Sequence, residues 1–304
     1  MKKIAVVGSL NMDYFAETNQ FPAAGETVLG KDFFMSLGGK GANQAIAASR
    51  LGGRVSMYGS VGNDPNSTLI RNKMKEEQID ISHLQIVSES HTGVALIEIC
   101  QSENRIVVIP GANLHTGISY INRVLDSLLE HDLVVFQLET PLEAIEYLVP
   151  KLYEKNKQVI LNPAPAQRLS PELIQKITYL TPNEHEYRQV LGVDEPMEHA
   201  LLKYPNKLVI TCGQKGVIFH DGGAALTIPA FKVEAVDTTG AGDTFCGALA
   251  VALSEGRPLK DSISFGCAAA GLSVLKKGAQ TGMPTRRELD QFIKGELSHE
   301  AGNI

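Results

Sequence analysis

The sequence contains no tryptophan and only four cysteines among its 304 residues. The cysteines form no Cys-x-x-Cys pair and lie near no pair of histidines, so neither a disulfide framework nor a zinc site is expected. The eight histidines show no metal-ligand spacing either, and none is assigned to zinc or to a catalytic triad. We interpret the cysteines as reduced, mostly buried side chains of a cytoplasmic protein. They are Cys100, Cys212, Cys246 and Cys267.

The sequence also lacks a long apolar run and an excess of basic residues. No apolar stretch approaches the length of a membrane span, and Ile4–Val7 is too short for the core of a signal peptide. A formal net charge of -6 argues against a nucleic-acid binder. With 43% hydrophobic and 20% charged residues, the composition is that of a globular protein with a sizeable core. We therefore expect neither a nucleic-acid partner nor a membrane partner.

The most informative stretch is a glycine-rich turn at residues 237–243, Asp-Thr-Thr-Gly-Ala-Gly-Asp. The apolar run Phe231–Val236 before it predicts a strand, and the small-residue run Ala248–Leu253 after it predicts a helix. A helix that begins near Gly240 would direct free N–H groups at an anion, most naturally a phosphate. Asp243 would repel phosphate unless it removes a proton from the attacking nucleophile. On this motif alone, a first-turn acid that favours the helix dipole is an equally good interpretation.

Short apolar runs alternate with helical segments, which predicts a mainly parallel α/β sheet. The predicted strands are 3–8, 55–59, 133–137, 158–161, 177–180 and 207–211, and the predicted helices are 65–77, 117–130 and 142–155. Two further runs, 92–100 and 104–109, are joined by the turn 101–103 and predict a hairpin. Together with an extended ribbon at 27–37, the hairpin would form a small separate sheet, which we interpret as a lid.

Polar residues follow several of the predicted strands. Asn11 and Asp13 are two apart, so on an extended chain they face the same way and could hold vicinal hydroxyls, although an Asx turn is the simpler interpretation. Further polar positions after strands are Glu139, Asn162, Asn183, Glu186 and Gly213. The carboxyl ends of parallel strands share one edge of a sheet, so these residues would surround one cleft.

Two more segments place polar groups at helix starts. The run Gly38–Gln44 lacks the third glycine of a dinucleotide fingerprint, but it would present Lys40 and Asn43 to a polyol or a phosphate. An exposed lysine on a turn is the alternative. Asn183 and Glu186 share a helix face and could hold water around magnesium, or could simply form a helix cap.

These motifs resemble the ribokinase-like family of carbohydrate kinases over nearly the whole chain, from residue 6 to residue 284. The two family signatures are Gly38–Gln44 and Asp237–Phe245, and the segments 161–166 and 181–184 point to the branch that acts on D-ribose. The resemblance implies a three-layer α/β/α fold with a mainly parallel central sheet. It further implies one catalytic domain over residues 1–304, with a β-lid formed by about 14–37 and 92–109.

The same resemblance implies ATP-dependent phosphorylation of D-ribose at O5, with Mg²⁺ and an activating K⁺ as cofactors. Sugar and ATP would be the small-molecule partners, and the lid would clasp a homodimer. Asp243 would be the catalytic base, and the N–H groups of Gly240, Ala241 and Gly242 would form the anion hole.

The remaining implied roles fall into three groups. The sugar-binding positions would be Asn11, Asp13, Gly39, Lys40, Asn43, Glu139 and Asp243. The nucleotide-binding positions would be Asn183, Glu186, Thr211, Cys212, Gly213, Gln214, Lys215, Gly216, Gly242 and Cys267, with Asn183 and Glu186 placing phosphate and magnesium. The monovalent cation would be held, largely by backbone carbonyls, at Asp237, Thr239, Ser273, Lys276, Gly278 and Gly282.

The sequence departs from the family pattern at three places. Cys267 stands where a histidine often lies near adenine, the stretch 193–206 is shorter than usual, and Gly282 replaces a common serine in the cation loop. Two alternative functions stay open: a sibling kinase for 2-deoxyribose, another sugar or a nucleoside, and a non-catalytic sugar-binding regulator. A nicotinamide-dependent enzyme is disfavoured because the dinucleotide fingerprint is missing.

Overall fold

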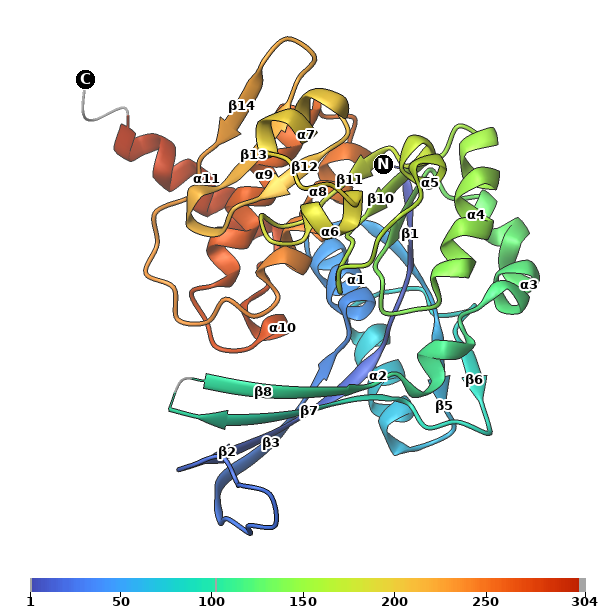
Figure 1. Cartoon of the computed structure of the whole chain (residues 1–304), viewed down its shortest axis with the longest axis vertical. Coiled ribbons are helices and arrows are strands. Elements are labelled where there is room, and N and C mark those ends of the chain that lie inside the picture. Colours follow the sequence, from blue (N-terminus) through green and yellow to red (C-terminus); the bar gives the residue numbers. More distant parts are fainter. Residues whose placement is uncertain (1, 102, 301–304) are drawn as a thin grey trace.

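The centre of the fold is a parallel sheet of five strands in the order β11-β10-β9-β1-β4 (Figure 1). The computed structural model describes residues 2–101 and 103–300, so Ser102 of the predicted hairpin turn lies outside the described residues. The strands are β1 (Lys3–Val7), β4 (Arg54–Tyr58), β9 (Leu133–Phe136), β10 (Gln158–Leu161) and β11 (Tyr179–Leu180). All neighbouring pairs in this sheet are parallel, as the sequence predicted.

Alternate residues of β1 enter two different hydrophobic cores. Ile4 and Val6 pack in the core that includes residues of α1 (Lys40–Arg50), α8 (Ala241–Ser254) and α9 (Leu259–Ser273). Ala5 and Val7 pack in the core shared with α3 (Ile118–Leu129) and α4 (Leu142–Glu154). Successive side chains of a strand point to opposite faces, so a run that is apolar throughout needs helices on both sides. Figure 1 shows α3 and α4 on one side of β1 and α8 and α9 on the other. The predicted three-layer α/β/α fold is confirmed.

A second sheet continues the central one beyond β11. It contains β12 (Val209–Thr211), β13 (Val217–His220) and β14 (Ala225–Ile228), which pair antiparallel. Single parallel bridges, Leu180 to Leu208 and Asn183 to Thr211, connect it to the central sheet. Of the predicted strand 207–211, Val209–Thr211 forms β12, and its main partner is the antiparallel strand β13.

The prediction of a strand at Phe231–Val236 is wrong. No residue of this segment belongs to a strand, although it follows β14 closely. Its apolar side chains line a cavity instead, Phe231, Val233 and Ala235 among them. Alternating apolar and charged residues are typical of a half-buried strand, but a segment that lines a cavity can show the same pattern without a strand partner.

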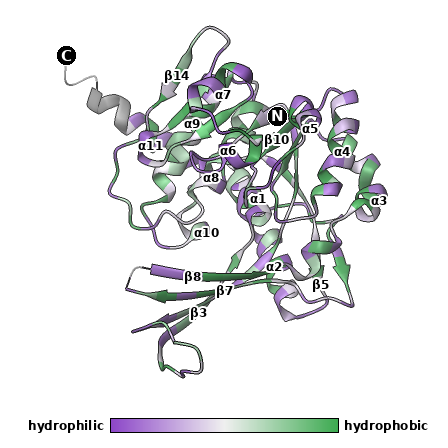
Figure 2. Ribbon diagram, viewed as in Figure 1, coloured by the Kyte–Doolittle hydropathy of each residue, from purple (hydrophilic) through white to green (hydrophobic). Residues whose placement is uncertain are grey.

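The predicted separate sheet is present and has four strands in the order β3-β2-β7-β8. The strands are β2 (Asn11–Thr18), β3 (Gly30–Gly38), β7 (Gly93–Cys100) and β8 (Glu103–Ile109). The pair β7 and β8 is the expected hairpin, and β2 pairs parallel to β7. The sheet projects from the body of the molecule, and its strands β7 and β8 are hydrophobic over much of their length (Figures 1 and 2).

The remaining elements include β5 (Ser60–Gly62) and β6 (Gln85–Val87), which pair parallel in a sheet of their own. The others are α2 (Pro65–Glu76), η1 (Gly111–His115), α5 (Pro171–Lys176), α6 (Tyr187–Leu191), α7 (Met197–Lys203), η2 (Gly213–Lys215), α10 (Ala279–Gly282) and α11 (Arg286–Glu300). All four cysteines are free and buried, as expected. Among the described residues, no helix combines the length and the apolarity needed to cross a membrane.

Candidate active site

Helix α8 begins at the glycine-rich turn, as the sequence predicted. Gly240 is the N-cap residue in a left-handed conformation, with φ of 76°, and a Cβ there would lie 2.8 Å from Ala279. The N–H of Ala241 donates to the carbonyl of Thr238 at 3.2 Å. Within the described residues, no protein acceptor pairs with the N–H groups of Gly240, Gly242 and Asp243. The positive end of the helix dipole is therefore available to an anion.

Asp243 lies in the first turn of α8 and is only 7% exposed. Its Oδ2 accepts a hydrogen bond from Asn43 Nδ2 at 2.9 Å, and its Oδ1 accepts one from Gln44 Nε2 at 3.0 Å. Burial raises the pKa of this carboxyl above its ordinary value, while the charge of Lys40 and the two amides act against burial. Asp243 is thus oriented, and it is more basic than a surface aspartate, as proton transfer near neutral pH requires.

The start of α1 and the end of β9 meet at Glu139. Its Oε2 accepts from the Ser9 hydroxyl at 2.5 Å and from the Lys40 N–H at 3.0 Å. The Ser9 hydroxyl also accepts from the N–H of Gly41 at 3.2 Å. Gly39 has φ of 87°, and a Cβ there would lie 2.9 Å from the backbone of Asn11. The backbone segments at residues 9–11, 39–41 and 139 therefore lie close together, and they bring the predicted sugar-binding residues to one place.

Asn11 and Asp13 lie at the beginning of β2, where that strand leaves the central body. Asn113, which the sequence analysis did not single out, fixes the first of them. Its Nδ2 donates to Asn11 Oδ1 at 2.7 Å, and its Oδ1 accepts from the N–H of Leu10 at 2.9 Å. Asp13 packs against Gly38, where an added Cβ would lie 2.1 Å from its carboxylate.

The charges at this site are strongly coupled. Burial, together with the charges of Glu139 and Asp243, raises the pKa of Asp13 from 3.8 to about 7. Burial of Lys40 lowers its pKa, but Asp243 and Glu139 outweigh this effect and raise the pKa overall. Lys40 therefore stays charged, and the site holds one ammonium among three carboxyl groups.

A cavity of about 480 Å³ adjoins the N-terminus of α8. Of the predicted nucleotide-binding residues, Thr211, Gly213, Gln214, Gly216, Gly242 and Cys267 line it. Cys212 is instead buried in the core, and Lys215 pairs with Glu184 in solvent. Phe231, Lys232 and Val233 also line the cavity, and the sequence analysis did not place them there. The apolar run that contains them was the available signal, and it was interpreted as a strand.

Asn183 and Glu186 do not line this cavity, and they form a reciprocal cap. Glu186 Oε2 accepts from the N–H of Asn183 at 2.9 Å, and Asn183 Oδ1 accepts from the N–H of Glu186 at 2.9 Å. This is the capping alternative that the spacing left open. Within the described residues, no donor contacts Glu186 Oε1. In the same part of the chain, no cluster of three or more His, Cys, Asp or Glu side chains could hold a metal ion by itself.

The predicted cation residues come together in one loop region. Asp237 accepts from the N–H of Thr239 at 2.9 Å and from the N–H of Gly278 at 2.8 Å. Although partial burial raises the pKa of Asp237, the hydrogen bonds from Thr239 and Gly278 and the charge of Lys277 outweigh burial and lower the pKa overall, so the carboxylate is charged. A Cβ on Gly282 would lie 2.0 Å from the carbonyl oxygen of Ser273 and 3.5 Å from that of Lys276. The donors that converge here are oxygens, which suit a hard monovalent cation.

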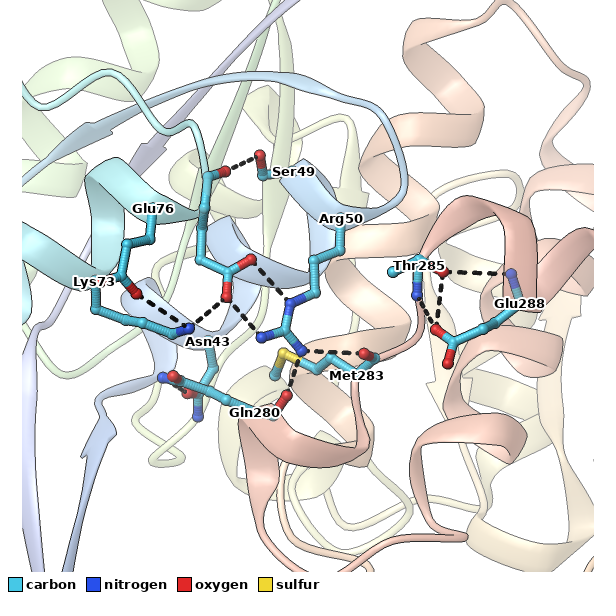
Figure 3. Close-up of polar contacts among 10 residues, drawn as sticks. Asn43, Ser49, Arg50, Lys73, Glu76, Gln280, Met283, Thr285 and Glu288 are labelled. Carbon is cyan, nitrogen blue, oxygen red and sulfur yellow. Dashed lines mark hydrogen bonds and ion pairs between the residues drawn. The ribbon is translucent and has the colours of Figure 1, made fainter.

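Arg50 ties this loop region to helix α1 (Figure 3). Its guanidinium donates to the carbonyl oxygens of Gln280 at 2.5 Å and Met283 at 3.1 Å. Glu77 holds the guanidinium with two further hydrogen bonds, at 2.9 and 2.6 Å. Arg50 and Lys73 together lower the pKa of Glu77 to about 2, with the Arg50 hydrogen bonds contributing most.

An anion-binding helix start, a buried carboxylate and an adjacent cavity define a phosphotransferase of the carbohydrate-kinase type. The model of the family described as "pfkB family carbohydrate kinase" matches residues 1–286. The chain therefore belongs to this family. A ribokinase from Bacillus subtilis (strain 168) is 43% identical over 293 residues, which cover 96% of this chain and 100% of that protein.

The chain is also similar to solved structures of ribokinases. A ribokinase structure from Thermotoga maritima has a TM-score of 0.88 and 36% identity, covering 97% of this chain and 100% of that chain. A structure of Arabidopsis thaliana ribokinase complexed with ribose and ATP also has a TM-score of 0.88, with 28% identity and coverage of 96% of this chain and 99% of that chain.

Proposed function

We propose that this protein is an ATP-dependent kinase that phosphorylates D-ribose at O5 to give D-ribose 5-phosphate. The observation that carries the proposal is the position of Asp243. Its buried carboxylate lies in the first turn of α8, between the Lys40 and Glu139 cluster and the 480 Å³ cavity. The sugar would occupy the cluster and ATP the cavity, so the γ-phosphate would meet the N–H groups at the start of α8.

Asp243 accepts the proton of the attacking 5-hydroxyl as that oxygen approaches the γ-phosphate in line. The free N–H groups of Gly240 and Gly242 stabilise the charge on the transferring phosphoryl group, and Lys40 adds a positive charge nearby. Ala241, the third predicted donor, is excluded because its N–H donates to the Thr238 carbonyl. Asn11, Asp13, Gly39, Asn43 and Glu139 position the sugar. Most of the rate enhancement comes from positioning and electrostatics, because the protein forms no covalent intermediate.

Two ions complete the proposed chemistry. Glu186, whose Oε1 has no donor among the described residues, and Asn183 are the residues that would hold water around a nucleotide-bound Mg²⁺. Magnesium supplies charge neutralisation at the phosphates. The carbonyl oxygens of Ser273 and Lys276, close to Gly282, and the carboxylate of Asp237 would hold K⁺. Such an ion would order the turn before α8 without touching the substrate.

The four-stranded sheet is proposed as a lid over the sugar and as the contact between two subunits. Closure would exclude water and limit wasteful hydrolysis of ATP. Apolar side chains of β3 and β8 lie in solvent, among them Phe33 at 61% exposure and Val107 at 59%. A surface of this kind is typical of an interface. We treat residues 1–304 as one catalytic domain with this lid, and the cytoplasmic location stays a prediction.

The proposed function is tested by supplying ATP, Mg²⁺ and one candidate acceptor at a time, with and without K⁺, while coupled detection follows ADP. The acceptors are D-ribose, 2-deoxyribose, ribulose and adenosine. D-ribose is expected to give the highest kcat/KM, with the phosphate at O5 by NMR of the product, and K⁺ is expected to raise the rate. Preference for another acceptor would assign the sibling function. Ribose binding without any release of ADP would assign the non-catalytic sensor.

A further inference from the structure

Both carboxylate oxygens of Asp243 are held by side-chain amides, and each amide is held in turn by a glutamine. Behind Asn43, the Gln280 Nε2 donates to Asn43 Oδ1 at 2.9 Å. Behind Gln44, the Gln137 Nε2 donates to Gln44 Oε1 at 2.7 Å. We call these two chains, Gln280–Asn43 and Gln137–Gln44, the amide arms of Asp243. Figure 3 shows Asn43 and Gln280 next to each other.

The orientation of the second arm is fixed by a backbone carbonyl. An amide can turn by half a rotation and exchange its donor for its acceptor, so a chain of amides needs an anchor. The Thr181 carbonyl can only accept, and Asn162 Nδ2 donates to it at 3.1 Å. Asn162 therefore turns its Oδ1 toward Gln44, whose Nε2 donates to it at 3.2 Å and to Asp243 at 3.0 Å. Gln44 Oε1 must then face Gln137, which has to donate.

Gln137 destabilises the folded state, because its side-chain oxygen is buried without a donor in the described part of the chain. We therefore expect a role for its side-chain N–H group. Gln137 and Gln44 are both 0% exposed. Gln137 Oε1 has no hydrogen-bond partner among the described residues, and it lies so close to Gly8 that a Cβ there would be 1.9 Å away. A buried acceptor without a donor destabilises the folded state, and an apolar side chain of the same size would avoid that cost. Among the described residues, the one side-chain hydrogen bond that Gln137 makes is its donation to Gln44.

We propose that Gln137 and Gln280 are positioning residues, which fix the amides of Gln44 and Asn43 so that both donate to Asp243 and hold its carboxylate in one orientation. Neither glutamine has a hydrogen bond to Asp243, so each acts through another residue. The role of this orientation in catalysis rests on the proposed function of Asp243 as the base. The hydrogen-bonded arms themselves do not depend on it.

The amide donors favour the charged form of Asp243 against burial. The titratable groups that face Asp243 are Lys40 on α1, Glu139 after β9, Asp13 on β2 and Cys246 on α8. Substituting either outer glutamine changes none of these charges. A change in the titration of Asp243 would therefore report the amides alone.

The test compares three variants, Gln137→Met, Gln280→Met and Gln158→Met. The last is a matched control, because Gln158 Oε1 is also buried without a partner among the described residues, but it lies at the start of β10, at the opposite end of that strand from Asn162. The titration of Asp243 is followed by ¹³C NMR of protein labelled at the aspartate carboxyl carbon, with Asp243→Asn to assign the resonance. The apparent pKa of Asp243 is expected to rise in Gln137→Met and Gln280→Met and to stay unchanged in Gln158→Met.

A second measurement follows turnover. On the acid side of the pH profile, kcat is expected to fall about tenfold in Gln280→Met, because Asn43 is then free to turn and to lose its hydrogen bond to the Asp243 carboxylate. Loss of a hydrogen bond to a charged group has an effect of this order. If both outer variants titrate Asp243 as the wild type does, the positioning role is refuted, even where the variants unfold at a lower temperature. Gln280 is in the short helix α10 and provides the test if Gln137→Met does not fold. The NMR titration needs no turnover, so a wild type that fails to phosphorylate ribose would refute the proposed function separately.

Discussion

Asp13 gives a prediction in which the sign and the size of a pH effect follow from the structure. The pKa of this carboxyl rises from 3.8 to about 7 in the folded protein, because it is buried beside Glu139 and Asp243. The folded protein therefore keeps a proton that the unfolded chain releases above pH 4. Stability is full below the ordinary pKa of an aspartate and falls as pH rises through the folded-state pKa near 7.

The expected magnitude follows from the two pKa values. The difference between about 7 and 3.8 is about 3, and one pKa unit corresponds to about 1.4 kcal/mol, so the upper limit is about 4 kcal/mol. Asp13 is half-buried rather than enclosed, and solvent screening reduces this figure to about 2 kcal/mol. Asp13→Asn removes the charge and should stabilise the ligand-free protein by this amount at pH 8.

The assay is urea unfolding of the wild type and Asp13→Asn at several pH values from 4 to 8. Titrating groups far from Asp13 cancel in the difference between the two proteins. The stabilisation by Asp13→Asn should grow between pH 4 and pH 7 and then become constant. Asp32→Asn, an exposed substitution on the neighbouring strand β3, is the control. A difference that does not change with pH would show that burial does not perturb Asp13, and the electrostatic account of the site would be wrong.

Three further predictions concern catalysis, the cation loop and the lid. Asp243→Asn should lower kcat at least about a hundredfold and leave the fold intact by circular dichroism, and near-normal turnover would end its assignment as the base. Gly282→Ala places a Cβ against the Ser273 carbonyl, at 2.0 Å, and should raise the K⁺ concentration for half-maximal activity at least about tenfold. Val107→Asp should convert the proposed dimer into a monomer by light scattering, and a wild type that is already monomeric would contradict the clasp.

Much of the fold could be predicted because burial on both faces leaves a simple pattern. The run Ile4–Val7 is apolar throughout because helices cover both sides of β1, and its neighbours repeat the pattern. The segment Phe231–Val236, in which apolar residues alternate with Lys232 and Glu234, also predicts a strand but lines a cavity, and local sequence does not distinguish these two environments. Antiparallel pairing of β12 with β13 was also missed, since the partner of a strand depends on the course of the chain between them.

The candidate site was predictable where glycine or spacing marked it. Gly240 marks the start of α8 because the left-handed conformation excludes most side chains there. Nothing comparable marks Asn113, Gln137 or Gln280. Gln137 and Gln44 are 93 positions apart, and Gln280 and Asn43 are 237 apart, so only the folded chain brings them together. A glutamine in a helix or after a strand is also an ordinary surface residue, which removes any compositional signal.

Helix α1 links the two regions that the proposed mechanism requires to act together. At its N-terminal end, Asn43 and Gln44 hold the carboxylate of Asp243. At its C-terminal end, Arg50 donates to the carbonyl oxygen of Gln280 in α10, and the side chain of that same Gln280 donates to Asn43. The segment after Gly278 is therefore fixed to α1 at two points, one of them a donor in an amide arm. An ion bound in the loop would order the residue that orients Asn43, and this gives a physical route by which a cation remote from the sugar could affect the base.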